Sequence, residues 1–120
     1  MIPRLARIMD ALVPAHREAT ELRERLESER QRIALAGGGL VDQAAWRTDT
    51  ERIAGLKKAI QQGLEDIARL GGVTKDLGLG LVDFPHLRDG CVVNLCWKHG
   101  EERIRYWHGL DEGYAARKPL

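Results

Sequence analysis

The apolar positions in the first third of the chain recur at alternating intervals of three and four residues. This spacing places them along one side of a helix and predicts a helix that packs lengthwise against a partner. Charged residues occupy most of the positions in between. The positions on the packing side are Leu12, Ala15, Ala19, Leu22, Leu26, Glu29 and Ile33.

Pro14 lies close to the start of this pattern. Proline lacks an amide hydrogen and disfavours helical backbone at the residue before it. We therefore expect a short helix over residues 3–12 to end there and a longer helix to begin. The run Ala36-Gly37-Gly38-Gly39 predicts the end of the longer helix.

A second apolar stripe predicts a helix that starts at Asp42 or Gln43, runs to Leu70 and is stopped by Gly71-Gly72. Two helices of similar length joined by a short glycine-rich loop pack antiparallel, with their stripes facing each other. Pairing within one hairpin is favoured, and an intermolecular coiled coil is the alternative. The second stripe consists of Ile53, Leu56, Ile60, Leu64, Ile67 and Leu70.

After Gly72 the pattern changes to short runs of β-branched and aromatic residues separated by glycines. We expect strands at 73–76 and 81–84, then a hairpin of 91–98 and 103–108 that turns at 99–102. The predicted fold is α+β, a long antiparallel helical hairpin followed by a small antiparallel sheet of three or four strands. A chain of 120 residues predicts a single domain, with the hairpin in 1–70 and a β segment with a C-terminal tail in 71–120.

Alternation along the expected hairpin assigns its side chains to two faces. A turn of two or four residues shifts the pairing by an even number, so His108 should share a face with Trp97, and Trp107 should share the other face with Cys96. The first face reads as a core. The second is too apolar for open solvent, so we expect the C-terminal tail, the helical hairpin or a second subunit to cover it. The same alternation puts Asp83 and His108 on opposite faces.

Charge and composition argue against several classes of protein. The 19 Lys and Arg residues are balanced by 18 Asp and Glu residues, for a net charge of +1, whereas nucleic-acid binding usually needs a basic surplus. No stretch approaches the roughly 20 apolar residues of a membrane span. The first residues also lack the apolar run of a signal peptide. We therefore expect a cytoplasmic protein with no nucleic-acid and no membrane partner.

Cys91 and Cys96 are the two cysteines, and both lie in one expected strand. Five residues apart, they would be roughly 16 Å from each other on opposite faces, whereas a disulfide needs Cα atoms within about 7 Å. Opposite directions also argue against joint metal ligation, so no metal and no cofactor is expected. Cys96 reads as a buried inert thiol. The alternative is a nucleophile with His99 or His108 as its base.

Charged residues beside aromatic ones in the β segment are the candidates for a functional site. Asp83, Glu101 and His108 are the catalytic candidates, because carboxylates and a histidine can exchange protons near neutral pH. The alternative for each is structural, for example a histidine bonded to backbone or a carboxylate paired with a nearby Lys or Arg. The candidate binding residues are Lys75, Asp76, Trp97, Trp107 and Arg117.

Arg117 lies in the tail, where no regular period is evident. A guanidinium group in an irregular segment needs a carboxylate or phosphate to hold it. Asp83, Asp111 or Glu112 could supply that partner from within the chain, and an anionic ligand could supply it from outside. Both readings stay open.

Several short motifs of the β segment together resemble a known bacterial and archaeal family. They are Lys75-Asp76, Gly80-Leu81-Val82-Asp83-Phe84-Pro85, Leu95-Cys96-Trp97-Lys98, Gly100-Glu101, Trp107-His108 and Arg117 with Pro119-Leu120. In this order over residues 70–120 they are similar to the family catalogued as domain of unknown function 2203. In the helical half, Leu12-Val13-Pro14 resembles the start of that family. The resemblance implies no established activity.

Two functions are therefore expected from different classes. The first is a non-catalytic, self-associating interaction module whose covered sheet face takes part in a homodimer. The second is an enzyme or a binder of a small anionic ligand, with a polar and aromatic pocket in the β segment. The second requires the candidate side chains to converge in one concave site.

Overall fold

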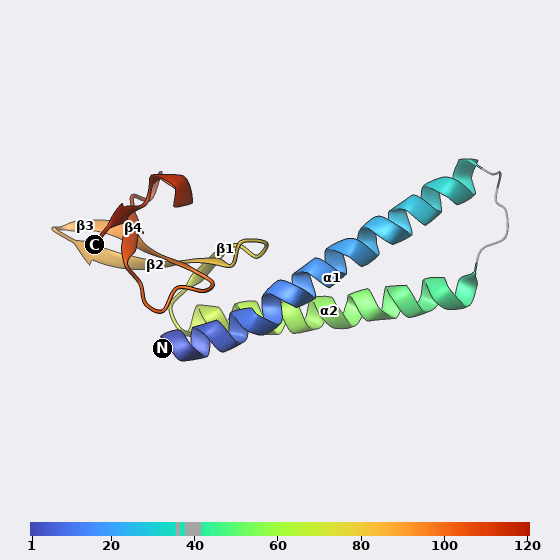
Figure 1. The fold of residues 1–120 in the computed structure, drawn as a ribbon, viewed down its shortest axis with the longest axis horizontal. Coiled ribbons are helices and arrows are strands. Elements are labelled where there is room, and N and C mark those ends of the chain that lie inside the picture. Colours follow the sequence, from blue (N-terminus) through green and yellow to red (C-terminus); the bar gives the residue numbers. More distant parts are fainter. Residues whose placement is uncertain (36, 38–41) are drawn as a thin grey trace.

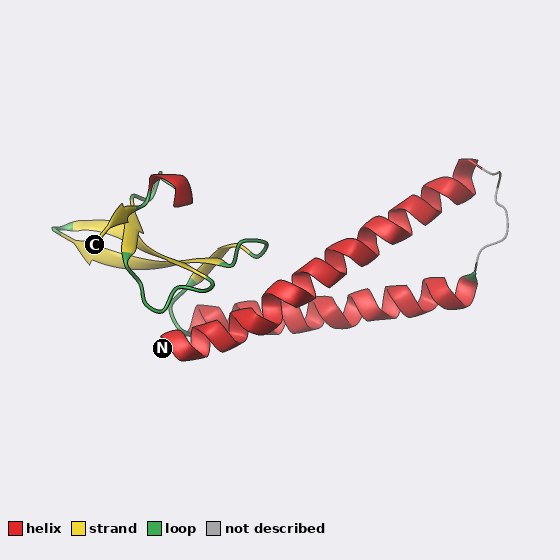
Figure 2. Ribbon diagram, in the orientation of Figure 1, coloured by secondary structure: helices red, strands yellow, loops and turns green. Residues whose placement is uncertain are grey.

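The computed structural model describes residues 1–35, 37 and 42–120 (Figure 1). Two long helices, α1 (Ile2–Leu35) and α2 (Gln43–Arg69), form an antiparallel hairpin, and strands follow (Figure 2). This arrangement confirms the predicted α+β fold, although the sheet has five strands where three or four were expected. The strands are β1 (Val73–Asp76), β2 (Leu81–Arg88), β3 (Cys91–Lys98), β4 (Tyr106–His108) and β5 (Lys118–Pro119), with a short 3-10 helix, η1 (Tyr114–Ala116), before β5.

The molecule is elongated, with extents of 63 × 26 × 20 Å. The sheet lies at the end of the hairpin that holds the N-terminus, and the remainder of the hairpin projects away from it (Figure 1). None of the helices in the described residues is both long and apolar enough to pass through a membrane.

Helix α1 runs through Pro14 without a break, so the prediction of two helices was wrong. Proline removes the hydrogen bond that its own nitrogen would donate, and packing offsets that loss. Leu5, Met9 and Leu12 are buried on one face of α1, against the sheet and the end of α2. Ala19 and Leu22, after the proline, are buried against α2, so packing holds the helix on both sides of Pro14. The predicted stop at 36–39 lies, apart from Gly37, outside the described residues.

Helix α2 begins and ends close to where the sequence predicts. Asp42 is its N-cap, and the Asp42 carboxylate accepts a 3.0 Å hydrogen bond from the Ala45 amide. At the other end Gly71 has a φ of +92°, which a residue with a side chain rarely adopts. The Gly72 amide then donates to the Ile67 carbonyl at 3.1 Å and closes the last turn.

The two helical stripes pack on each other within one chain, as predicted. Gly63 leaves room for the Leu12 side chain, because a Cβ atom at position 63 would lie 2.4 Å from Leu12 Cδ2. Two interhelical ion pairs set the register, Arg25 with Asp49 at 2.6 Å and Arg52 with Glu18 at 2.8 Å. Pairs as exposed as these add little to the free energy of unfolding. The apolar seam therefore supplies most of the stability of the hairpin.

The sheet is antiparallel throughout, with strand order β1-β2-β3-β4-β5. The prediction ended the second strand at Phe84, but β2 continues through Pro85 to Arg88 and forms a long hairpin with β3. Asp89 and Gly90 make the turn, with φ angles of +50° and +81°. An Asp-Gly pair is a strong signal for such a turn, whereas a proline within a run weakens the prediction of a strand.

One face of the sheet packs on the base of the helical hairpin. Val82, Phe84 and Trp97 point to this side and form one apolar cluster with residues of α1 and α2. Trp97 is fully buried there. The opposite face is covered by the C-terminal segment, one of the three coverings expected from the sequence.

Candidate functional site

The register between β3 and β4 decides which side chains meet on the tail-covered face. Asn94 pairs with His108, Leu95 with Trp107 and Cys96 with Tyr106. The predicted register was wrong by one residue, because the connection spans the seven residues 99–105 instead of an even number. A shift of one residue moves every side chain of a strand to the other face. His108 therefore joins Cys96, and Trp107 leaves it.

Glu101 organises the connection that produces this register. The Glu101 amide donates to the Lys98 carbonyl at 3.0 Å, and the Glu101 carboxylate accepts from the Lys98 amide at 2.6 Å. The Trp97 indole nitrogen donates to the Glu101 carbonyl at 3.0 Å. These three bonds hold a loop that begins as a tight turn and then extends to Arg105.

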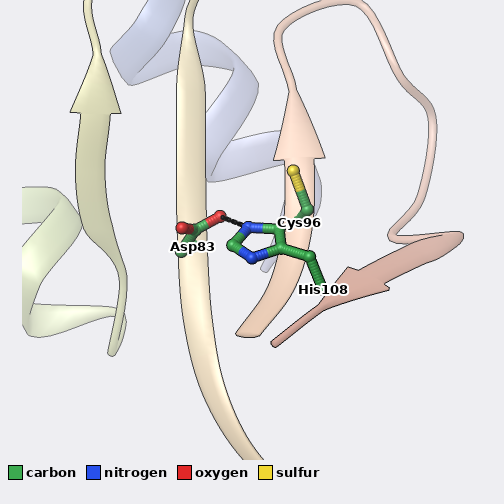
Figure 3. Close-up of side chains that lie close together, drawn as sticks. All are labelled: Asp83, Cys96 and His108. Carbon is green, nitrogen blue, oxygen red and sulfur yellow. Dashed lines mark hydrogen bonds and ion pairs between the residues drawn. The ribbon is translucent and has the colours of Figure 1, made fainter. Parts of the chain in front are cut away.

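Asp83, Cys96 and His108 meet on the tail-covered face from the adjacent strands β2, β3 and β4 (Figure 3). Their exposed fractions are 4%, 1% and 2%. Asp83 Oδ1 lies 3.0 Å from His108 Nε2. A carboxylate oxygen, the thiol sulfur and an imidazole nitrogen all lie within 4.8 Å of one another. The prediction that Asp83 and His108 lie on opposite faces was wrong, because β4 is shifted by one residue from the predicted register.

Both nitrogens of His108 face oxygen atoms. Nδ1 lies 2.9 Å from the Gly109 carbonyl, which can only accept, so Nδ1 carries a proton and donates. Nε2 and Asp83 then share a second proton, located on one or the other. In either state the pair carries no net charge, which lowers the free-energy cost of burying it.

Cys96 has no base in this arrangement. Burial raises the pKa of the Cys96 thiol, and the Asp83 carboxylate raises it further against the opposing effect of Arg117. A nucleophilic cysteine needs a lowered pKa or an adjacent base, and both nitrogens of His108 are already engaged. The geometry is therefore not that of a Cys-His-Asp hydrolase.

A pocket of about 180 Å³ opens beside the cluster, between the sheet and the tail. Lys75 from β1 and Tyr114 from η1 contribute to its walls. Glu112 is held by Lys118 at 2.8 Å and by the Gly109 amide at 2.8 Å, and both interactions lower the pKa of its carboxyl. The pocket is lined by Lys75, Leu81, Asp83, Asn94, Cys96, His108, Leu110, Glu112, Gly113 and Tyr114.

Arg117 fastens the tail beside this pocket. Its guanidinium binds both oxygens of Glu101, at 3.1 and 3.0 Å. It also lies 4.0 Å from the ring centre of Tyr106 and 4.3 Å from that of Tyr114. The partner of Arg117 is thus internal, although it is Glu101 and none of the three carboxylates expected. Arg117 and Glu101 neutralise each other's charge, and their two hydrogen bonds hold the C-terminal segment over the pocket.

The other predicted binding residues lie elsewhere. Asp76 is exposed and accepts a hydrogen bond from the Leu79 amide at 3.0 Å, so it shapes a turn. Trp97 belongs to the apolar core on the opposite face. Trp107 also lies outside the pocket, with Arg88 and Lys118 each 4.7 Å from its ring centre. Of the eight residues predicted, Lys75, Asp83 and His108 line the pocket.

Sequence reasoning left Cys96, Asn94 and Tyr114 out of the site. Cys96 and Asn94 alternate with core residues along β3, so the sequence places them on the non-core face. With β4 one residue out of register, that face was predicted to hold Trp107 instead of His108. Tyr114 reaches the pocket through the tail, for which the sequence offered no period.

The fold and the site together define a small α+β protein in which a helical hairpin supports a sheet with a buried Asp-Cys-His cluster. A family model described as an uncharacterized conserved protein, DUF2203, matches residues 1–120, and the chain belongs to that family. The resemblance noted over residues 70–120 thus extends over the helical hairpin. Neither a curated protein nor a solved structure matches the chain.

Proposed function

We propose that this protein binds a small ion or molecule in the pocket between the sheet and its C-terminal segment. The observation that carries the proposal is the convergence of three buried ionisable side chains, Asp83, Cys96 and His108, on one pocket. Most ionisable groups stay in water because burial is costly. A small domain that buries three of them together, beside a cavity, has the features of a binding site.

The volume of the pocket limits the size of the ligand. Pockets for drug-sized molecules measure about 300–1,000 Å³, and one water occupies about 30 Å³ in the liquid. A pocket of about 180 Å³ therefore suits an ion with a few waters or a small anion. Lys75 would favour an anion, whereas Asp83, Cys96 and Glu112 offer donor atoms to a cation.

Binding without covalent catalysis is the form of this function that the geometry favours. The Cys96 thiol has a raised pKa, and His108 has no free nitrogen with which to act as its base. The site is thereby suited to hold a ligand and is poorly suited to attack one.

Thermal unfolding of the full-length protein with a panel of probes tests the proposal. The panel consists of phosphate, sulfate, acetate, Mg²⁺, Mn²⁺ and Zn²⁺. A bound probe at 100 times its Kd stabilises the folded state by about 2.7 kcal/mol and raises Tm by several degrees. The shift should shrink in Asp83→Asn if the bound probe is a cation and in Lys75→Met if it is an anion. It should persist in the control Lys57→Met, an exposed residue of α2. No shift with any probe, or a shift that neither pocket variant reduces, would contradict the proposal.

Self-association is a second candidate function, supported by a different observation. Leu87 and Val92 form a cross-strand pair near the β2–β3 turn, and they are 66% and 50% exposed. A homodimer could bury this pair together with the adjacent part of the sheet face. Sedimentation equilibrium of the wild type and of Leu87→Lys tests it. We expect a dimer that the substitution dissociates, and a monomeric wild type at high concentration would exclude it.

A cytoplasmic location is part of the same proposal. Its support is that Cys91 and Cys96 are both free, since cysteines in secreted domains of this size are usually paired. Fractionation of the native cells with an antibody would test it, and recovery in the extracellular or envelope fraction would contradict it.

A further inference from the structure

We propose that Asp83, Cys96 and His108 form a binding site for a divalent transition-metal ion of the zinc class. This inference rests on the proposed binding function and names its ligand. Within the part of the chain that the structure describes, these residues are the one group of three or more His, Cys, Asp and Glu side chains close enough to share an ion. They supply one nitrogen, one sulfur and one oxygen, a donor set that zinc accepts and that magnesium and calcium do not favour.

The spacing of the donor atoms fits such an ion with small adjustments. Tetrahedral zinc, with bonds of about 2.0–2.3 Å, holds its ligand atoms roughly 3.3–3.8 Å apart. Asp83 Oδ1 and His108 Nε2 are 3.0 Å apart, and the whole set lies within 4.8 Å. Coordination would part the first two slightly and draw Cys96 inward by about 1 Å. The pocket would supply the fourth position, filled by water or by an exchangeable ligand.

The hydrogen bond on the other side of His108 is an independent observation that points to a ligand role. A histidine that binds a metal usually donates its remaining N–H to a carbonyl or carboxylate, which fixes the ring and its tautomer. His108 Nδ1 donates in this way to the Gly109 carbonyl at 2.9 Å, which leaves Nε2 directed at Asp83.

The charges around the cluster permit a divalent ion. Arg117 acts on the Cys96 thiol, and Glu101 neutralises the Arg117 guanidinium through two hydrogen bonds. Coordination would release the proton shared by Asp83 and His108 and the proton of the Cys96 thiol. Two protons would leave as one divalent ion enters, so the buried cluster would stay neutral as a whole. An anion in the same place would instead face the Asp83 carboxylate.

The chain contains a matched comparison for these residues. His99 Nε2 lies 2.6 Å from Asp10 Oδ1, which makes the same type of pair as His108 and Asp83. The side chains of His99 and Asp10 are 30% and 65% exposed, and among the described residues no cysteine joins them in a group of three possible ligands. Cys91 is the corresponding exposed thiol. If the ion merely seeks any surface His, Asp or Cys, these residues should bind it as well.

Titration of the chelator-treated full-length protein with Co²⁺ tests the site. We expect one Co²⁺ per chain, with a thiolate-to-metal charge-transfer absorption that persists in Cys91→Ser and His99→Gln. Cys96→Ser should abolish that absorption, and His108→Gln should weaken binding at least tenfold. Circular dichroism of each variant shows whether it folds.

X-ray absorption of the zinc-loaded wild type gives an answer that does not depend on variants. We expect one sulfur and two or three nitrogen or oxygen ligands. A first coordination shell without sulfur would overturn the metal site. So would a Co²⁺ charge-transfer absorption that survives Cys96→Ser. If an anion of the panel stabilises the protein and Co²⁺ does not bind, the metal inference fails and the proposed binding function stands. If no probe binds, both fail.

Discussion

Both faces of the sheet bury side chains at its centre, but the buried side chains are of opposite kinds. The face toward the hairpin carries Val82, Phe84 and Trp97, whose burial is favourable by the hydrophobic effect. The face toward the tail buries Asp83, Cys96 and His108, whose burial must be offset by pairing. The difference indicates that the first face holds the fold together, and it agrees with the proposed binding role of the second.

The largest effect should come from the apolar face. Trp97→Ala should lower the free energy of unfolding by about 4 kcal/mol, because it removes a fully buried ring and leaves a cavity. Urea unfolding measures the change. Trp107→Ala, at a half-buried ring on the same sheet, is the control and should cost less than half as much. Trp107 lies on the same face of the sheet, so equal losses would show that the depth of burial on this face does not determine the loss of stability.

A smaller loss should follow from breaking the polar pair. His108→Leu should cost about 3 kcal/mol at neutral pH, because it leaves Asp83 buried without its partner. The double variant Asp83→Val/His108→Leu should unfold at higher urea than the single one, since a buried pair can often be replaced by apolar residues at little cost.

The exposed pair provides the control for this experiment. His99→Leu removes the partner of Asp10, which stays in water, and should change stability by less than about 1 kcal/mol. A double variant less stable than His108→Leu would indicate that the polar cluster itself stabilises the fold. That outcome would weaken the separation of roles between the two faces.

The smallest effect is a dependence on pH at Cys96. The pKa of this thiol is raised above its ordinary value of 9.0, so at alkaline pH the folded state holds a proton that the unfolded state has lost. Stability from this source is full below about pH 8 and falls as pH rises through the folded pKa, by less than about 1.4 kcal/mol per pH unit.

Comparing metal-free Cys91→Ser with Cys91→Ser/Cys96→Ala isolates this term. Urea unfolding at about pH 8 and about pH 10 should show a steeper loss of stability in the protein that keeps Cys96. Identical losses would mean that the thiol is not held in its protonated form.

Much of the fold could be predicted because its signals are local. The stripes of the two helices, the Asp42 cap and the Gly71-Gly72 stop are each encoded within a few residues. The continuation of α1 through Pro14 could not be predicted in this way. It depends on contacts with the sheet and the end of α2, more than 50 residues away in the chain.

The site was predicted in part. Lys75, Asp83 and His108 were named from their chemistry, and they do line one pocket. Their grouping with Cys96 was missed because it depends on an odd number of residues between β3 and β4. That arrangement is held by hydrogen bonds of Glu101 with the backbone of Lys98 and the Trp97 side chain. Residue types indicated which groups could act, and the register decided which of them meet.

The seven-residue connection 99–105 has a consequence for how this family can diverge. Substitutions outside Glu101 leave both the count of residues and the bonds of the loop unchanged, so natural variation at those positions should be compatible with the site. Insertion or loss of a single residue would turn His108 toward the helices and Trp107 toward Asp83. Lineages that keep the cluster should therefore change the length of this loop in steps of two, or not at all.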